Sequence, residues 1–301
     1  MSIQSNFLTF HQTILLSDDD GRANLREKRE RVLRRLRLGS PRSFDSFNQG
    51  SYAMSTGIVP VNGDYDIDVG VIYSGAQRPD PLTVKGWVYE AVKDHTSDVV
   101  WRRPCITVWY KSGGRRIYHV DLAVYWQDAW GRLSLAVGKQ HSSGAHVAWL
   151  ESDPKGFIEQ VKGHLSGEDR AQFRRVIRYL KRWKDVHFPS EGNAAPVGIG
   201  ITVAALQWFQ PVKAGWRAEG ASQYDDLAAT QALVRSMRSA FGARLSVRLP
   251  VQPFTDVFER MTDQQMLEFR GRLEALDANL ERARLGASSV LKTAFGEDFP
   301  A

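Results

Sequence analysis

Two short alternating segments constrain the fold of this 301-residue chain more than any other feature of its sequence. Residues 65–73 read YDIDVGVIY, and residues 118–126 read YHVDLAVYW. Successive side chains of a β-strand point to opposite faces, so Asp66 and Asp68 are expected on one face, with apolar residues on the other. The same period places Asp121 on one face of the second segment. If the two strands are neighbours, three carboxylates converge on one spot.

Three carboxylates that meet at one point repel one another unless a cation lies among them. Their oxygens prefer hard cations, so Asp66, Asp68 and Asp121 are candidate ligands for two Mg²⁺ ions, with Mn²⁺ as an alternative. Upstream, Gly50 and Ser51 form an expected turn whose N–H groups and hydroxyl suit a phosphate. This combination predicts nucleotidyl transfer, in which metals activate a hydroxyl and neutralise the leaving pyrophosphate.

These residues resemble the polymerase-β-like nucleotidyltransferase superfamily. Within it, residues 49–52 (QGSY), Thr56 and residues 65–70 (YDIDVG) are most similar to the bacterial cGAS/DncV-like nucleotidyltransferases (CD-NTases) of CBASS antiphage systems. Residues 175–185 (RVIRYLKRWKD) and 295–300 (FGEDFP) are also similar to that family. The resemblance implies catalysis and metal binding by the three aspartates, and it implies nucleotide contacts by the following residues: Gln49, Gly50, Ser51, Lys181 and Thr202.

By the same resemblance, the product is a cyclic di- or trinucleotide second messenger, similar to cGAMP, made from NTPs with release of pyrophosphate. ATP, GTP or both are the implied substrates, and pyrimidine NTPs are possible ones. Regulatory partners, or an enzyme that conjugates the C-terminal residue, are implied as well. Two alternatives stay open: an enzyme that adds nucleotides to RNA or to a protein, and a catalytically inactive nucleotide or RNA sensor.

Composition narrows the cellular setting. The net charge of +6 favours anionic ligands but is too mild and too interspersed to demand nucleic acid. Cys105 is the single cysteine, which excludes an internal disulfide and favours a cytoplasmic location. The sequence contains no run of about 18 apolar residues, so no membrane span is expected.

The predicted architecture is α+β, with a mixed sheet flanked by helices. Residues 1–150 are expected to form the catalytic core with an N-terminal spine helix, and residues 151–301 a helical lobe that closes the nucleotide cleft. Helices are expected at residues 17–38, 83–95, 166–187, 196–209, 223–241 and 262–285, followed by a final short helix; strands are also expected at 99–111 and 115–126. Residues 127–165 are expected to be mainly loops. Helix-capping pairs are expected at Ser17 with Asp20, Ser166 with Asp169, and Thr262 with Gln265.

Several side chains allow two interpretations. The basic face of 166–187 is either solvated or, through Lys181, a contact for the triphosphate of the nucleotide. His119 is either a general base or, more simply, a hydrogen-bonded neighbour of Asp121. His141 and His146 are expected to be loop residues rather than a metal pair, because no cysteine is near them.

Overall fold

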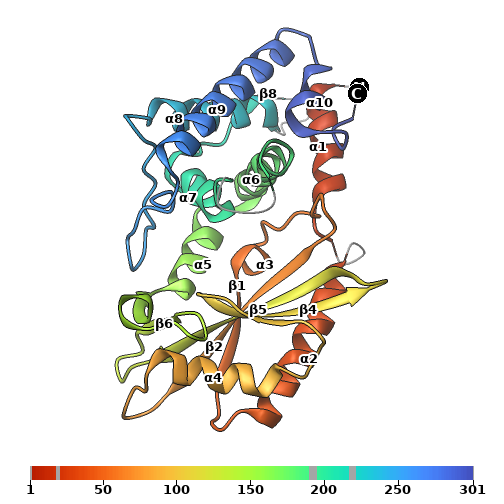
Figure 1. Ribbon diagram of the computed structural model, residues 1–301. Coiled ribbons are helices and arrows are strands. Elements are labelled where there is room, and N and C mark those ends of the chain that lie inside the picture. Colours follow the sequence, from red (N-terminus) through yellow and green to blue (C-terminus); the bar gives the residue numbers. More distant parts are fainter. Residues whose placement is uncertain (1, 18–20, 190–194, 217–221, 301) are drawn as a thin grey trace.

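The computed structural model describes residues 2–17, 21–189, 195–216 and 222–300. A mixed sheet carries α2 and α4 on one face, and the remaining long helices lie beyond the other face (Figure 1). This arrangement confirms the predicted α+β class with a helical lobe. None of the described helices combines the length and apolarity needed to cross a membrane.

The main sheet has seven strands, in the order β1-β2-β5-β4-β3, with β6 paired to β5 and β7 to β6. The pair β2–β5 is parallel and the other pairs are antiparallel. The two aspartate-bearing strands are therefore neighbours. The strands are β1 Asp45–Gln49, β2 Tyr65–Ser74, β3 Val99–Trp101, β4 Cys105–Ser112, β5 Arg115–Gln127, β6 Leu133–Val137 and β7 Ala148–Ser152.

Alternation along β2 and β5 sets what each face of the sheet presents. Ile67 and Val69 on β2, like Val120 and Leu122 on β5, are buried in the core beneath α2 and α4. The intervening residues face the helical lobe. Because the pairing is in parallel register, Asp68 lies opposite Asp121.

Ten α-helices are described. The two longest, α6 and α9, belong to the helical lobe. The helices are α1 Ile3–Ile14, α2 Ala23–Gly39, α3 Gly50–Met54, α4 Pro81–Val92, α5 Pro154–Gly163, α6 Gly167–His187, α7 Gly198–Trp208, α8 Asp226–Ser239, α9 Asp263–Arg284 and α10 Val290–Phe295. A two-stranded sheet of β8 (Lys213–Trp216) and β9 (Ser222–Tyr224) completes the described elements.

The capping predictions had mixed outcomes. Thr262 and Gln265 form the reciprocal capping box predicted for α9. Ser166 is the N-cap of α6, but its side chain makes no cap hydrogen bond, so that prediction was wrong. The helix predicted from residue 17 begins at Ala23, and Asp20 of its expected capping pair lies outside the described residues.

Residues 127–165 contain more regular structure than the predicted loops. Here the alternating runs LSLAV and AWLES form β6 and β7, which extend the sheet at one edge. Asp153 then caps α5 by accepting a hydrogen bond from the Gly156 N–H, and Pro154 occupies the first helical turn. The connection between the two strands, residues 138–147, holds two of the glycines and two of the serines of this region.

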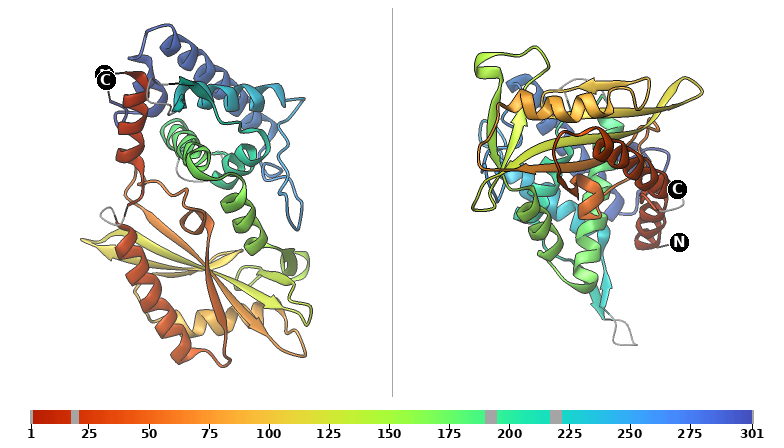
Figure 2. Two further views of the ribbon diagram at one scale, coloured as in Figure 1. Left: turned by 180° about the vertical axis from the view of Figure 1, so that it is seen from behind. Right: turned by 90° about the horizontal axis from the view of Figure 1, so that it is seen from below.

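Helix α1 was not predicted. Phe7, Phe10 and Ile14 recur at helical spacing and are fully buried in the core of the helical lobe. Phe299, near the other end of the chain, packs on Phe7 and Phe10 with ring centroids 5.1 Å apart in both pairs. Figures 1 and 2 show α1 and α10 side by side. The first helix thus packs with the last, while the domain division near residue 150 stays a prediction.

Candidate active site

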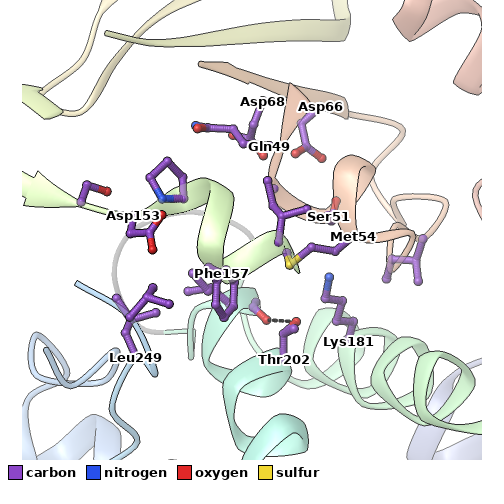
Figure 3. A pocket seen from close by; sticks show the side chains of 18 of the residues that line it. Gln49, Ser51, Met54, Asp66, Asp68, Asp153, Phe157, Lys181, Thr202 and Leu249 are labelled. Atoms are coloured by element: carbon purple, nitrogen blue, oxygen red, sulfur yellow. Dashed lines mark hydrogen bonds between the residues drawn. The ribbon is translucent and has the colours of Figure 1, made fainter. Parts of the chain in front are cut away.

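A cavity of about 540 Å³ lies between the sheet and the helical lobe. Figure 3 shows Asp66 and Asp68 on one side of it and Lys181 and Thr202 on the other. Asp121 lies next to Asp68 on β5 and is not among the lining residues. The predicted site residues that line the cavity are Gln49, Gly50, Ser51, Asp66, Asp68, Lys181 and Thr202.

Gly50 begins α3 at the point where β1 ends. Its φ of +64° lies in the left-handed region, and a Cβ added there would be 1.8 Å from Oδ2 of Asp68. Only glycine permits both this backbone conformation and this approach of the carboxylate. The close contact with Asp68 therefore explains why a glycine is needed in the turn beside the Asp-x-Asp strand.

Gln49 and Ser51 flank this glycine. The Tyr125 hydroxyl donates a 3.0 Å hydrogen bond to Oε1 of Gln49. The carbonyl of Ser51 accepts a 3.0 Å hydrogen bond from the Thr56 N–H, which closes α3 onto the segment that follows it. These contacts hold the residues of the turn in place against the sheet.

The carboxylates influence one another across the two strands. The pKa of Asp68 is raised to about 8, first by burial and then by the carboxylates of Asp66 and Asp121. Burial also raises the pKa of Asp66, and Asp121 adds to this effect, while His119 and Lys181 oppose it. Asp66 is exposed where it opens into the cavity. Protein atoms surround that cavity, and this explains why the charged form of Asp66 is disfavoured.

The register of β2 and β5 brings the three aspartates to neighbouring strands, as predicted. Their side chains do not, however, form a complete set of metal ligands. Among the described residues, no three His, Cys, Asp or Glu side chains form a group that could hold a metal ion. Oδ1 of Asp121 accepts a hydrogen bond from the Thr107 hydroxyl of β4. Mutual repulsion of the carboxylates favours separation of their side chains.

The donor set nevertheless fits a hard divalent cation. The three candidate ligands are oxygen donors on one sheet face, and Gly50 leaves room for the carboxylate of Asp68. The raised pKa values of Asp66 and Asp68 indicate that a nearby cation would relieve unfavourable charge.

His119 makes hydrogen-bonding and packing contacts. Its Nδ1 lies 3.0 Å from Oδ1 of Asp64, its Nε2 lies 3.9 Å from Oδ2 of Asp121, and its ring packs on Trp109. Burial lowers its pKa, but the hydrogen bond with Asp64 and the nearby carboxylates outweigh this effect and raise it. Nδ1 is engaged by Asp64 and Nε2 faces Asp121, so the geometry favours the neighbour interpretation.

The basic face of α6 is directed inward, against the solvated interpretation. Arg178 donates to the carbonyls of Ser55 and Gly57, and Lys181 donates to the carbonyl and hydroxyl oxygens of Thr56. Arg182 donates to the carbonyl of Val59. We call residues 55–59 the strap. The strap follows α3, and its residue 58 lines the cavity.

Lys181 therefore reaches the cavity from α6, alongside the strap. Burial lowers its pKa to about 8, and Asp66 opposes that shift. Its ammonium is held near the carboxylates without an ion pair to them that would fill the space among the aspartates. Thr202, at the start of α7, is fully buried and donates its hydroxyl to the Gly198 carbonyl at 3.4 Å.

Sequence reasoning missed most of the apolar wall of the cavity. It is built from α3, α5, the start of α7 and the 249–253 segment, which come together only through tertiary packing. Its main members are Met54, Phe157, Ile158, Ile199, Leu249 and Val251. No local pattern could have identified them, since each also reads as an ordinary core residue. His141 and His146 are exposed between β6 and β7, in line with the loop prediction.

Comparisons with known proteins agree with this geometry. Residues 45–125 match the family model described as the nucleotidyltransferase domain of cyclic GMP-AMP synthase DncV-like proteins. A cyclic GMP-AMP synthase of Escherichia albertii is 26% identical over 215 residues, which cover 66% of this chain and 45% of that protein. The match thus spans less than half the length of that relative.

Solved structures share the fold over nearly the whole chain. The CD-NTase CdnG of Bradyrhizobium diazoefficiens, in complex with GTP, gives a TM-score of 0.77 at 16% identity, with 99% of this chain and 96% of that chain covered. The Vibrio cholerae DncV cyclic AMP-GMP synthase gives 0.75 at 16% identity, with 98% of each chain covered. E. coli CdnC with ATP gives 0.69 at 18% identity, with 99% and 98% covered. These comparisons show that residues 45–125 are similar to the nucleotidyltransferase domain of DncV-like proteins and that the chain shares the fold of the solved CD-NTases over nearly its whole length.

Proposed function

We propose that this chain is a Mg²⁺-dependent nucleotidyltransferase that joins NTPs into a cyclic di- or trinucleotide with release of pyrophosphate. The observation that carries the proposal is the register of β2 and β5. It sets Asp68 opposite Asp121, beside a cavity that also contains Gly50, Ser51 and Lys181. Similarity to proteins described as cyclic GMP-AMP synthases supports a cyclic product.

Each residue has a defined part in this proposal. Asp66, Asp68 and Asp121 would hold divalent cations, which supply charge neutralisation and a more acidic attacking hydroxyl when bound. The ammonium of Lys181 and the turn at Ser51 hold the triphosphate of the donor nucleotide. Asp121, next to Asp68 on β5, positions the attacking ribose hydroxyl.

The shape of the cavity supports nucleotides as substrates. Asp66, Asp68 and the Gly-Ser turn line the side of the sheet, and Lys181 and Lys184 of α6 lie across from them. Its apolar residues come mainly from α5, α7 and the 249–253 segment. A nucleotide has the matching division between a charged triphosphate and a flat, weakly polar base. The apolar wall holds the base and excludes water from the phosphates. A second transfer within the linear product then closes the ring.

The test is incubation of the purified protein with labelled NTPs and Mg²⁺, followed by phosphatase and mass spectrometry. Label that resists phosphatase and has the mass of a cyclic di- or trinucleotide is the expected result. Label transferred to added RNA or protein would instead assign the chain to template-independent nucleotide addition. Absence of turnover with any divalent metal would favour a catalytically inactive sensor.

We further propose a role in bacterial antiphage defence, under control of a partner protein. Its support is the likeness to CD-NTases, one of which has been solved as a CdnC complex with a HORMA protein. Phage plaque counts on cells that express the wild-type chain with its genomic neighbours, compared with the Asp68→Asn variant, test this role. Equal plaque counts would contradict it.

A further inference from the structure

Thr107 of β4 is a buried polar residue whose side chain contacts Asp121, the third aspartate of the candidate site. The two residues are direct partners across the antiparallel pair β4–β5. The Thr107 hydroxyl donates to Oδ1 of Asp121 at 2.5 Å. Thr107 is fully buried, whereas the side chain of Asp121 is 21% exposed. The buried hydroxyl therefore holds one oxygen of a carboxylate that is itself partly exposed.

The other surroundings of Asp121 leave Oδ2 more open than Oδ1. Nε2 of His119 lies 3.9 Å from Oδ2, which is beyond hydrogen-bonding distance. His119 is itself held by Asp64. One oxygen of the carboxylate is thus fixed by a direct hydrogen bond, and the second remains available to a ligand.

The thiol of Cys105 helps to orient the hydroxyl of Thr107. Sγ of Cys105, two residues earlier on the same face of β4, lies 3.7 Å from Oγ1 of Thr107. With the Thr107 proton donated to Asp121, the thiol is the group that can donate to Oγ1. Both side chains are buried, so water does not compete for this hydrogen bond.

We propose that Thr107 is a positioning residue that fixes Asp121 as a ligand for the divalent cation of the active site. A ligating carboxylate with one oxygen hydrogen-bonded loses less rotational freedom when it binds the ion, and partners of this kind affect metal affinity and ligand orientation. The inference rests on the proposed function, because it assigns Thr107 to the reaction of that same site.

The test compares Thr107→Val, which keeps the shape and removes the hydroxyl, with Thr107→Ser, which restores it. Mn²⁺ binding is measured by titration calorimetry in the presence of a non-hydrolysable NTP analogue. The Mg²⁺ concentration for half-maximal turnover is measured in parallel. We expect T107V to bind Mn²⁺ roughly tenfold more weakly and to need correspondingly more Mg²⁺, and T107S to stay within about twofold of wild type.

Thr230→Val is the matched control. Thr230 is equally buried and donates its hydroxyl to the Asp226 carbonyl within α8, so this variant also loses a buried hydrogen bond, but in the helical lobe. It should keep wild-type Mn²⁺ affinity even if its melting temperature falls. In an Asp121→Asn background, T107V should weaken Mn²⁺ binding no further, because Thr107 acts through Asp121.

The possible outcomes separate the inference from the proposed function. Wild-type Mn²⁺ affinity in T107V, or equal weakening in T107V and T107S, overturns the role of Thr107 while leaving the enzyme proposal intact. A wild-type protein that binds no Mn²⁺ with the analogue and makes no product overturns both. If T107V is unfolded at the assay temperature, Thr107→Ala takes its place with the same expectation.

Discussion

At the scale of single residues, the contact between Gly50 and Asp68 links the turn to the catalytic strand. The carboxylate of Asp68 occupies the space that a side chain at position 50 would take. Turn and strand are thus sterically coupled, so a substitution at residue 50 should displace the carboxylate of Asp68.

Gly50→Ala should reduce turnover strongly, by roughly a hundredfold, the size of effect seen when one transition-state-stabilising group is lost. The new Cβ would displace the Asp68 carboxylate, and alanine is disfavoured at a φ of +64°. The measurement is steady-state turnover, with Gly63→Ala as the control: Gly63 also has a positive φ, but a Cβ there meets nothing within 4 Å. Equal losses in both variants would contradict the steric explanation.

Asp68→Asn should abolish turnover while leaving the melting temperature in metal-free buffer at pH 8 unchanged or raised. The folded state disfavours the charged form of Asp68, whose pKa is raised to about 8, so a neutral amide relieves that penalty. Differential scanning calorimetry and the product assay check the two parts. A large fall in melting temperature would point to a structural role for this carboxylate instead of a ligand role.

At the scale of elements, α6 and the strap join the helical lobe to the sheet. Three cations of one helix donate to four backbone carbonyls of residues 55, 56, 57 and 59. The strap is also tied to the end of α1, since the Val59 N–H donates to the Ile14 carbonyl. A segment without regular structure is therefore paired on both sides, as buried backbone requires.

Arg178→Ala should lower the free energy of unfolding by about 2–4 kcal/mol, because it leaves the buried carbonyls of Ser55 and Gly57 without their charged donor. Chemical denaturation measures this quantity. Arg270→Ala, which removes an exposed i,i+4 pair with Glu274 on α9, is the control and should change it by less than about 1 kcal/mol. Similar losses in the two variants would show that the strap contacts contribute little.

The sequence predicted the elements whose signals are local. Alternation identified β2 and β5, helical spacing identified α6 and α9, and the Asp-x-Asp spacing identified two of the three aspartates as partners on one face. The inward direction of the α6 cations was not predictable. Whether a basic helix face meets water or backbone carbonyls depends on which distant segment covers it. Most of the apolar wall of the cavity was missed for the same reason.

At the scale of the whole molecule, His11 adds a pH-sensitive contact between α1 and α6. Its Nε2 lies 3.0 Å from Nη1 of Arg178, so the imidazole accepts from a guanidinium and is neutral. Burial, followed by the charges of Arg178 and Arg175, lowers the pKa of His11 to about 4.

Because this pKa lies below the unfolded value of 6.5, the contribution of His11 to stability is complete above pH 6.5 and is lost as the pH falls towards 4. The melting temperature of wild type should therefore fall more between pH 7 and pH 4 than that of His11→Gln. His141→Gln, which changes an exposed histidine, serves as the control and should follow wild type. Parallel curves for wild type and H11Q would contradict the assignment.

The aromatic cluster formed by α1 and the last residues has a practical consequence for dissecting the protein. Phe7 and Phe10 come from the beginning of the chain, yet they fill the centre of the helical lobe beside Phe295 and Phe299. A fragment that starts near residue 150 would lack those two rings and leave a large void, so it should be isolated as a poorly packed species. Separate expression of the two halves would then yield a working enzyme only if the amino-terminal piece supplies its first helix to the other.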